Sequence, residues 1–156
     1  MSGVTNKDRS FFVCETEQPD DLTQVEFEAL TWVEVGFVVS IGETGAVPNE
    51  VSQSYHGTST VQKKFATIDA GSPAVELGYA PTDVGQIALK AIANNNVNYA
   101  FKMEMADNPN GSTNTIKYNR GLIGGPTHTN GAVEDFDNRT YVLALNQTQI
   151  EVAPTA

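Results

Sequence analysis

The chain has 156 residues, of which 40% are hydrophobic, and its 19 acidic residues against nine Lys and Arg give a formal charge of −10. This length fits a single domain over residues 1–156, and the hydrophobic content excludes disorder along the whole chain. The charge argues against tight binding of nucleic acid through phosphates, and no apolar run of 18 residues is present to form a transmembrane helix.

The first part of the chain predicts a flexible segment, about residues 1–10, followed by a short apolar strand at 11–14. A turn cluster at 19–21 comes next. The clearest strand covers residues 33–41, where one face of a period-2 pattern is apolar and is expected to be buried: Val33, Val35, Phe37, Val39 and Ile41.

Residues 42–60 are expected to form a long loop, because they contain three glycines, one proline and many small polar residues. A connection of 19 residues is well beyond the usual 4–6, so it is expected to be functional or disordered, and part of it is able to form a hairpin arm. A strand at 61–68 follows, with Val61 and Phe65 on its buried face. A further strand is expected at 74–79.

One helix is predicted, at about residues 83–94. Asp83 stands at the N-cap position with Gln86 three residues later, as in a capping box, and the run of three asparagines at 94–96 ends the helix. The apolar stripe at helical spacing comprises Val84, Ile87, Ala88, Ala91 and Ile92. A single helix of this kind needs a sheet to bury its stripe.

The last third of the chain reads as strands. An alternating strand at 97–105 leads through a turn at 107–111 into a strand at 115–123, which the glycines and proline at 121–126 are expected to break. Residues 139–152 form two short strands or one bent strand. The fold class predicted is mainly β (α+β), a β-sandwich or barrel with one flanking helix (about 83–94) and a long loop (about 42–60).

No catalytic, cofactor or metal site is expected. The histidines, His56 and His128, lie in polar loops, and the single cysteine, Cys14, is expected to be a small core residue. The turn at 107–111 fails the calcium-loop pattern because its twelfth position is Tyr118. The acidic run at 134–137 favours a solvated face over a cation site.

The features that stand out are structural. Trp32 and Val38 are apolar on the face opposite Val33 and Val39, and the chain carries a long polar loop. Open strand edges are a liability in a monomer, and closing them in a ring is one remedy. Such features suit a subunit whose extra surfaces are covered by copies of itself.

A strand through TWVEVGFVVSIGE is followed by a long loop, a strand, the dipeptide Pro81-Thr82 and a helix of the D-x-G-Q-x-x-L kind (Asp83, Gly85, Gln86 and Leu89). An alternating strand, a glycine-containing strand at 118–124 and a final strand at 140–152 complete the order. In this order and spacing, over residues 30–153, the chain resembles the major tail tube proteins of long, non-contractile-tailed bacteriophages (the siphophage tail tube family).

The resemblance implies a structural virion protein without catalytic activity or cofactor. It implies hexameric rings that stack into the hollow tail tube, through which the DNA genome passes without specific binding. It also implies a tape measure protein, a tail terminator and distal tail proteins as partners, assembly in the bacterial host cytoplasm and no membrane contact. The candidates for contacts between subunits or rings are Glu43, Val47, Pro48, Glu50, Val51, Tyr55, Phe11 and Phe12.

The sequence leaves alternatives open. One is a related ring or tube protein, such as a tail terminator, a head–tail joining protein or a secretion-system inner tube. Another is a carbohydrate-binding β-sandwich module, which usually exposes aromatic residues on one sheet face. Here Trp32, Tyr55 and Tyr79 are scattered, which weakens that alternative.

Overall fold

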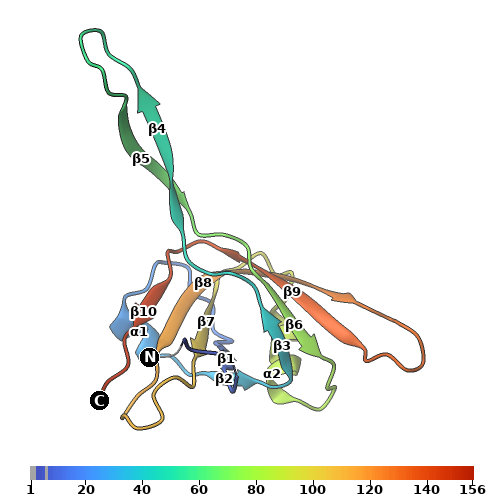
Figure 1. Ribbon diagram of the computed structural model, residues 1–156. Helices are drawn as coiled ribbons and strands as arrows, with labels where there is room; N and C mark the ends of the chain where they lie inside the picture. Colours follow the sequence, from blue (N-terminus) through green and yellow to red (C-terminus); the bar gives the residue numbers. More distant parts are fainter. Residues whose placement is uncertain (1–2, 6) are drawn as a thin grey trace.

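The computed structural model describes residues 3–5 and 7–156 (Figure 1). The predicted flexible segment (about 1–10) includes residues 1–2 and 6, which lie outside the described residues. The predicted mainly β class with a flanking helix is confirmed. The structure contains an eight-stranded antiparallel sheet in the order β2-β1-β7-β8-β9-β6-β3, with β10 beside β8. It also contains a two-stranded sheet and the flanking helix α2.

The strands of the main sheet are β1 (Ser10–Val13), β2 (Val33–Val35), β3 (Val38–Ile41), β6 (Ala74–Gly78), β7 (Tyr99–Glu104), β8 (Ile116–His128), β9 (Asn138–Leu145) and β10 (Ile150–Val152). The two-stranded sheet consists of β4 (Val47–Gln53) and β5 (Gln62–Asp69). The helices are α1 (Gln24–Glu28) and α2 (Val84–Ile92).

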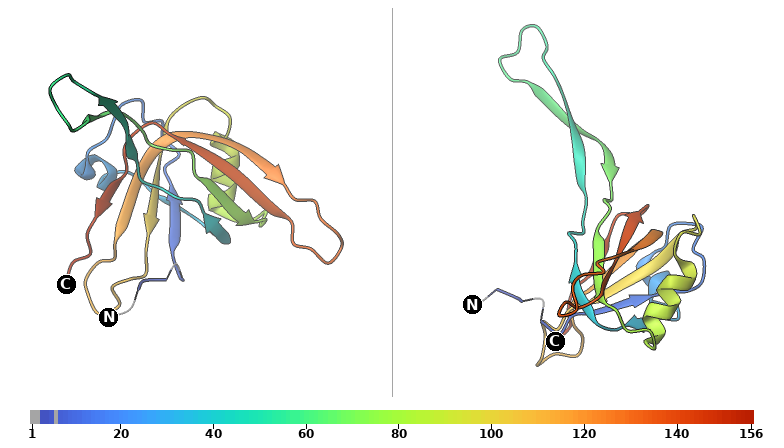
Figure 2. Two further views of the ribbon diagram at one scale, coloured as in Figure 1. Left: turned by 45° about the horizontal axis from the view of Figure 1, so that its top comes forward. Right: turned by 90° about the vertical axis from the view of Figure 1, so that its right-hand side faces the viewer.

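The main sheet curves around one hydrophobic core, and α2 packs against β1 and β2 at one end of it (Figure 2). Apolar residues from β1, β2, β6, β7, β8 and β9 fill this core together with α2; the largest fully buried side chains among them are Phe11, Phe101, Leu77, Leu89 and Leu143. The first and last strands of the sheet, β2 and β3, are consecutive in the chain, so the sheet nearly closes on itself.

A second, smaller cluster lies around α1, which the sequence pattern did not predict. The buried residues Cys14, Phe27, Ala100 and Tyr118 form it, and Trp32 packs against them. Thr23 caps α1 by accepting a hydrogen bond from the Glu26 amide at 3.4 Å. Trp32 is thereby covered within the chain, as Cys14 is buried in the predicted manner.

The prediction of one strand over residues 33–41 is wrong, because the chain turns between β2 and β3. Phe37 has a positive φ of 61° and an exposed side chain instead of a buried one. The Gly36 amide donates to Asp83 Oδ2 at 3.1 Å, and a Cβ at Gly36 would lie 2.7 Å from Asp83 Oδ1. Glycine at 36 therefore allows the helix cap to sit directly on the break.

Helix α2, its Asp83 N-cap and the burial of Ala88 and Ile92 are confirmed, whereas the rest of the predicted buried stripe is wrong, because the helix is rotated. Val84 is 70% exposed and Ile87 is 54% exposed. The buried residues are instead Gly85, Gln86, Ala88, Leu89 and Ile92. A Cβ at Gly85 would lie 2.1 Å from the Glu34 carbonyl oxygen, so glycine lets the helix backbone approach β2 and sets this rotation.

The prediction that the strand at 115–123 is broken by the glycines and proline at 121–126 is also wrong. Strand β8 continues to His128, with a register shift between Gly124 and Thr127. A Cβ at Gly121 would lie 2.2 Å from the Ala144 carbonyl oxygen, so this glycine allows a close approach of β9. The two short strands predicted as one option within 139–152 are present as β9 and β10.

Candidate assembly interface

Residues 42–69 form a long projection, which we call the arm, so the hairpin arm that the sequence allows within residues 42–60 is present. Strands β4 and β5 pair antiparallel along it, from Val47 opposite Asp69 to Gln53 opposite Gln62. The arm extends well away from the rest of the molecule (Figure 1). Strand β5 coincides with the strand predicted at 61–68, whereas β4 is not predicted, because a ribbon that is exposed on both faces needs no alternating apolar pattern.

Both faces of the arm carry exposed apolar side chains. Residues directly opposite each other in an antiparallel pair share a face, which places Pro48 with Ile68 and Glu50 with Phe65. Phe65 is 72% exposed, and on the other face Val47 is 82% exposed. The prediction that Phe65 is buried is therefore wrong. An isolated two-stranded ribbon is at best marginally stable in water, so the arm is a surface in need of a partner.

The structure brings six of the eight predicted contact residues together on the arm: Glu43, Val47, Pro48, Glu50, Val51 and Tyr55. Glu50 forms an exposed ion pair with Lys63 at 3.5 Å. Phe11 is 0% exposed in the core, so its inclusion among contact residues is wrong: alternation along β1 points it inward.

Phe12, the remaining candidate, is half-buried beneath a lysine. Lys102 Nζ lies 4.2 Å from the centre of the Phe12 ring and 5.4 Å from that of Trp32. Burial lowers the pKa of Lys102, and the nearby Glu104 carboxylate opposes this effect. Phe12 thus has an intramolecular role and does not join the arm.

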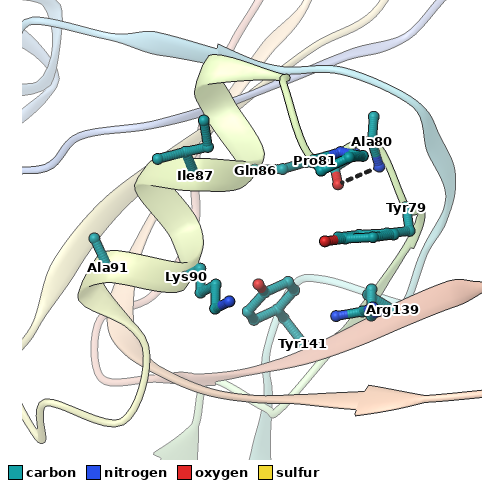
Figure 3. A pocket seen from close by; sticks show the side chains of 9 residues that line it. All are labelled: Tyr79, Ala80, Pro81, Gln86, Ile87, Lys90, Ala91, Arg139 and Tyr141. Carbon is teal, nitrogen blue, oxygen red and sulfur yellow. Dashed lines mark hydrogen bonds between the residues drawn. The ribbon is translucent and has the colours of Figure 1, made fainter.

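A groove of about 500 Å³ lies between α2 and the strands β6 and β9 (Figure 3). We call it the α2 groove. Its walls are mainly apolar, and two cationic residues, Lys90 and Arg139, stand in it: Tyr79, Ala80, Pro81, Gln86, Ile87, Lys90, Ala91, Arg139 and Tyr141 line the groove. The sequence pattern does not predict this groove, because it assigns Ile87 and Ala91 to the buried stripe of the helix.

The two cationic residues of the α2 groove differ in whether an anionic side chain pairs with them. The Arg139 guanidinium stacks on Tyr79, with its central carbon 3.8 Å from the ring centre, and donates to Asp137 Oδ2 at 3.0 Å. Lys90 is exposed and has no ion pair with any residue that the structure describes. Burial raises the pKa of the Tyr141 hydroxyl, and Arg139 opposes this effect. Lys90 thus supplies an uncompensated charge.

The loop that joins β8 to β9, residues 129–137, carries two large apolar side chains into solvent. We call it the hairpin tip. Val133 is fully exposed and Phe136 is 88% exposed. The loop is internally bonded: the Ala132 amide donates to Asp135 Oδ2 at 2.8 Å, and the Asn138 amide donates to Thr129 Oγ1 at 3.0 Å. The hairpin tip is therefore an ordered apolar surface and not simply the solvated acidic face that the sequence favours.

No group of three His, Cys, Asp or Glu side chains is placed to hold a metal ion in the part of the chain that the structure describes. Nor does any described helix have the length and apolar character needed to cross a membrane.

Comparison with known proteins identifies the fold. No protein-family model and no curated protein sequence matches the chain. Among solved structures, the sheath/tube terminator of PVC, an extracellular contractile injection system, matches at a TM-score of 0.69 and 10% identity, over 98% of this chain and 99% of that chain. The PVC sheath–tube complex matches at a TM-score of 0.69 and 10% identity, over 97% and 92% of the two chains.

The SPP1 tail tube, solved by solid-state NMR and cryo-EM, matches at a TM-score of 0.66 and 12% identity, over 99% of this chain and 81% of that chain. At these identities the likeness establishes the fold. The chain therefore has the fold found in these tail tube and sheath–tube structures, which confirms the fold that the resemblance to tail tube proteins implied.

Proposed function

We propose that this protein is a single-domain structural subunit of a phage tail tube that assembles with copies of itself into hexameric rings. These rings stack into a hollow tube through which DNA passes. The observation that carries the proposal is the arm, an ordered ribbon with apolar side chains that no part of the described chain covers. The shared fold with the SPP1 tail tube supports it, because the match extends over 99% of this chain.

The arm supplies contacts between rings or between neighbours in one ring. Full burial of an apolar side chain of this size contributes about 1.5–3 kcal/mol relative to its exposed state. Val47, Val51, Phe65 and Ile68 are each more than half exposed, so their burial contributes several kcal/mol per arm. Glu43, Pro48, Glu50 and Tyr55 accompany them. Every copy in a ring repeats the contact, which multiplies its effect.

The formal charge of −10 suits a tube for DNA. A predominantly negative lumen repels phosphates, so the genome slides without binding. The protein acts in the virion without catalytic activity, after assembly in the bacterial host cytoplasm. Its further partners are a tape measure protein, a tail terminator and distal tail proteins.

Negative-stain electron microscopy of the purified protein tests the proposal. Rings or tubes are expected, alone or after addition of tail initiation components. A species that stays monomeric at high concentration with those components present refutes the proposed function.

A paired substitution tests the role of the arm. Phe65→Ser with Ile68→Ser removes apolar surface from one face of the ribbon, and the body is expected to keep its circular dichroism spectrum while tubes are lost. Val25→Ser is the matched control, because Val25 is equally exposed but lies on α1. Tubes of normal length from the arm variant remove the arm from the mechanism.

A tube terminator is the second candidate, favoured by one observation. The PVC sheath/tube terminator matches this chain with the same TM-score as the PVC sheath–tube complex, so the fold fits both roles. Micrographs separate them: a terminator forms single rings that cap preformed tubes, whereas a tube subunit extends them.

A further inference from the structure

The α2 groove is apolar and carries a cation, whereas the hairpin tip exposes large apolar side chains and carboxylates. The groove offers apolar walls from Ile87, Ala91 and Pro81 and a volume of about 500 Å³. Cavities of roughly 300–1,000 Å³ accept groups of the size of an aromatic side chain or larger. The hairpin tip presents Phe136 and Val133, both almost entirely in solvent, so neither occupies a site on its own chain.

The charges that remain unpaired on these two surfaces are opposite. On the hairpin tip, Asp137 pairs with Arg139, whereas Asp135 accepts only from the Ala132 amide and Glu134 is exposed without a bond to the described residues, so these two carboxylates have no cationic partner among the described residues. In the groove, Arg139 is held by Asp137 and Tyr79, which leaves Lys90 as the uncompensated cation. The tip therefore offers uncompensated carboxylates, and the groove offers an uncompensated ammonium group.

We propose that the hairpin tip of one copy docks into the α2 groove of a neighbouring copy, with Phe136 among Ile87, Pro81 and Ala91 and with Glu134 beside Lys90. This contact rests on the proposed self-assembly, and it is a surface through which neighbouring copies in one ring bind each other. It adds a contact that is separate from the arm.

The placement of the two surfaces favours a head-to-tail contact. Arg139 and Tyr141 line the groove from β9, and the same strand leads out to the hairpin tip, which projects past β6 and α2 (Figure 1). Because tip and groove are different patches of one molecule, each copy offers both to different neighbours. A contact of this type closes into a ring when its rotation permits.

The tip is also preorganised for docking. Its backbone is closed by Thr129, whose amide donates to the Asn138 carbonyl oxygen at 3.2 Å and whose Oγ1 accepts from the Asn138 amide. The turn bond from the Asp135 amide to the Ala132 carbonyl oxygen, at 3.0 Å, adds to this closure. An ordered loop loses less conformational entropy on binding than a mobile one.

Cysteine cross-linking tests the contact directly. The double variant Ile87→Cys with Phe136→Cys places one thiol in the groove and one on the tip, while Cys14 stays buried. Mild oxidation is expected to give a ladder of covalent oligomers on a non-reducing gel. The control pair Ile87→Cys with Val25→Cys is expected to give none. Dimers without higher species, or a ladder from the control pair alone, overturn the head-to-tail contact.

Substitutions measure how much the contact contributes. Phe136→Ser is expected to raise the protein concentration for half-maximal assembly about tenfold or more, as for a truncated interface anchor, whereas Val25→Ser changes it by less than about threefold. Lys90→Glu and Glu134→Lys are each expected to weaken assembly up to about fivefold. Combining the two charge reversals restores it, and a combined variant no better than either single variant refutes the pairing.

The outcomes separate this inference from the proposed function. Rings that survive Phe136→Ser, together with no ladder from the Ile87→Cys/Phe136→Cys variant, overturn the groove contact and leave the tube function intact. A ladder from a protein that forms neither rings nor tubes supports the contact and overturns the function.

Discussion

Replacing Gln86 with leucine tests how the helix is fixed to the sheet. The Gln86 side chain is buried and makes three hydrogen bonds: Nε2 donates to the carbonyl oxygens of Gly36 at 3.1 Å and of Gly78 at 2.8 Å, and Oε1 accepts from the Ala80 amide at 3.0 Å. It thereby joins α2 to the break between β2 and β3 and to the end of β6. The capping box predicted for this residue is not formed, and these bonds take its place.

The expected cost follows from the bond count. Each hydrogen bond contributes a net of about 0.5–1.5 kcal/mol, and leucine keeps part of the packing while leaving three backbone groups without partners. We expect Gln86→Leu to lower the free energy of unfolding by about 2–4 kcal/mol. For a chain of this length that is a fall in Tm of roughly 5–15 °C.

Urea unfolding followed by the fluorescence of Trp32, the single tryptophan, measures this change. The control is Gln24→Leu, since the Gln24 side chain is on the surface of α1 and bonds only to Glu28, at 3.1 Å. A loss below about 1 kcal/mol for Gln86→Leu, or equal losses for both variants, refutes the account of this junction.

Three other outcomes are expected. Gly85→Ala improves helix propensity by about 1 kcal/mol. It is nevertheless expected to lower the urea midpoint of unfolding, because the added Cβ would lie 2.1 Å from the Glu34 carbonyl oxygen. A raised midpoint contradicts this expectation. Arg120→Ala is expected to lower the free energy of unfolding by about 2–4 kcal/mol in the same assay. The buried guanidinium donates to the Gln18 carbonyl oxygen at 2.8 Å and to Asp21 at 3.0 Å, and the variant loses both bonds. A fall of less than about 1 kcal/mol contradicts this expectation. The Thr115 hydroxyl and amide bonds lower the pKa of Asp107, so the carboxylate stabilises the fold above the ordinary Asp range and this contribution is lost as the pH falls through the lowered pKa. Asp107→Asn should therefore flatten the acid limb of a stability–pH profile, and an unchanged limb excludes that contribution.

The sequence predicts the elements whose signals are local. The Asp83 cap, the alternation along β7 and the turn into β8 each depend on neighbouring residues, and all are present. The buried face of α2 is different, because it is set by the closeness of Gly85 to Glu34, which are far apart in the chain. No pattern within the helix reports that contact.

The sequence likewise predicts only part of the candidate interface. The long polar stretch with Gly42, Gly45 and Gly57 predicts a long loop or hairpin arm, and the arm begins in this stretch. Its ribbon structure depends on pairing with β5, whose apolar Phe65 reads as a core residue although its surroundings are solvent. The α2 groove is formed by α2, β6 and β9 together, so no single stretch of sequence reveals it.

Strand β8 has a consequence for how the molecule opens under native conditions. From Ile116 to Tyr118 it is paired on both edges, with β7 on one side and β10 on the other, and from Gly121 onward it pairs with β9. Each amide at residues 116–118 points to one of these two neighbours, so exchange of all three with deuterated solvent requires separation from both β7 and β10. The arm, whose two described strands pair only with each other, is expected to exchange before β8 in the free subunit, and under the proposed function its protection from exchange would report the extent of tube assembly.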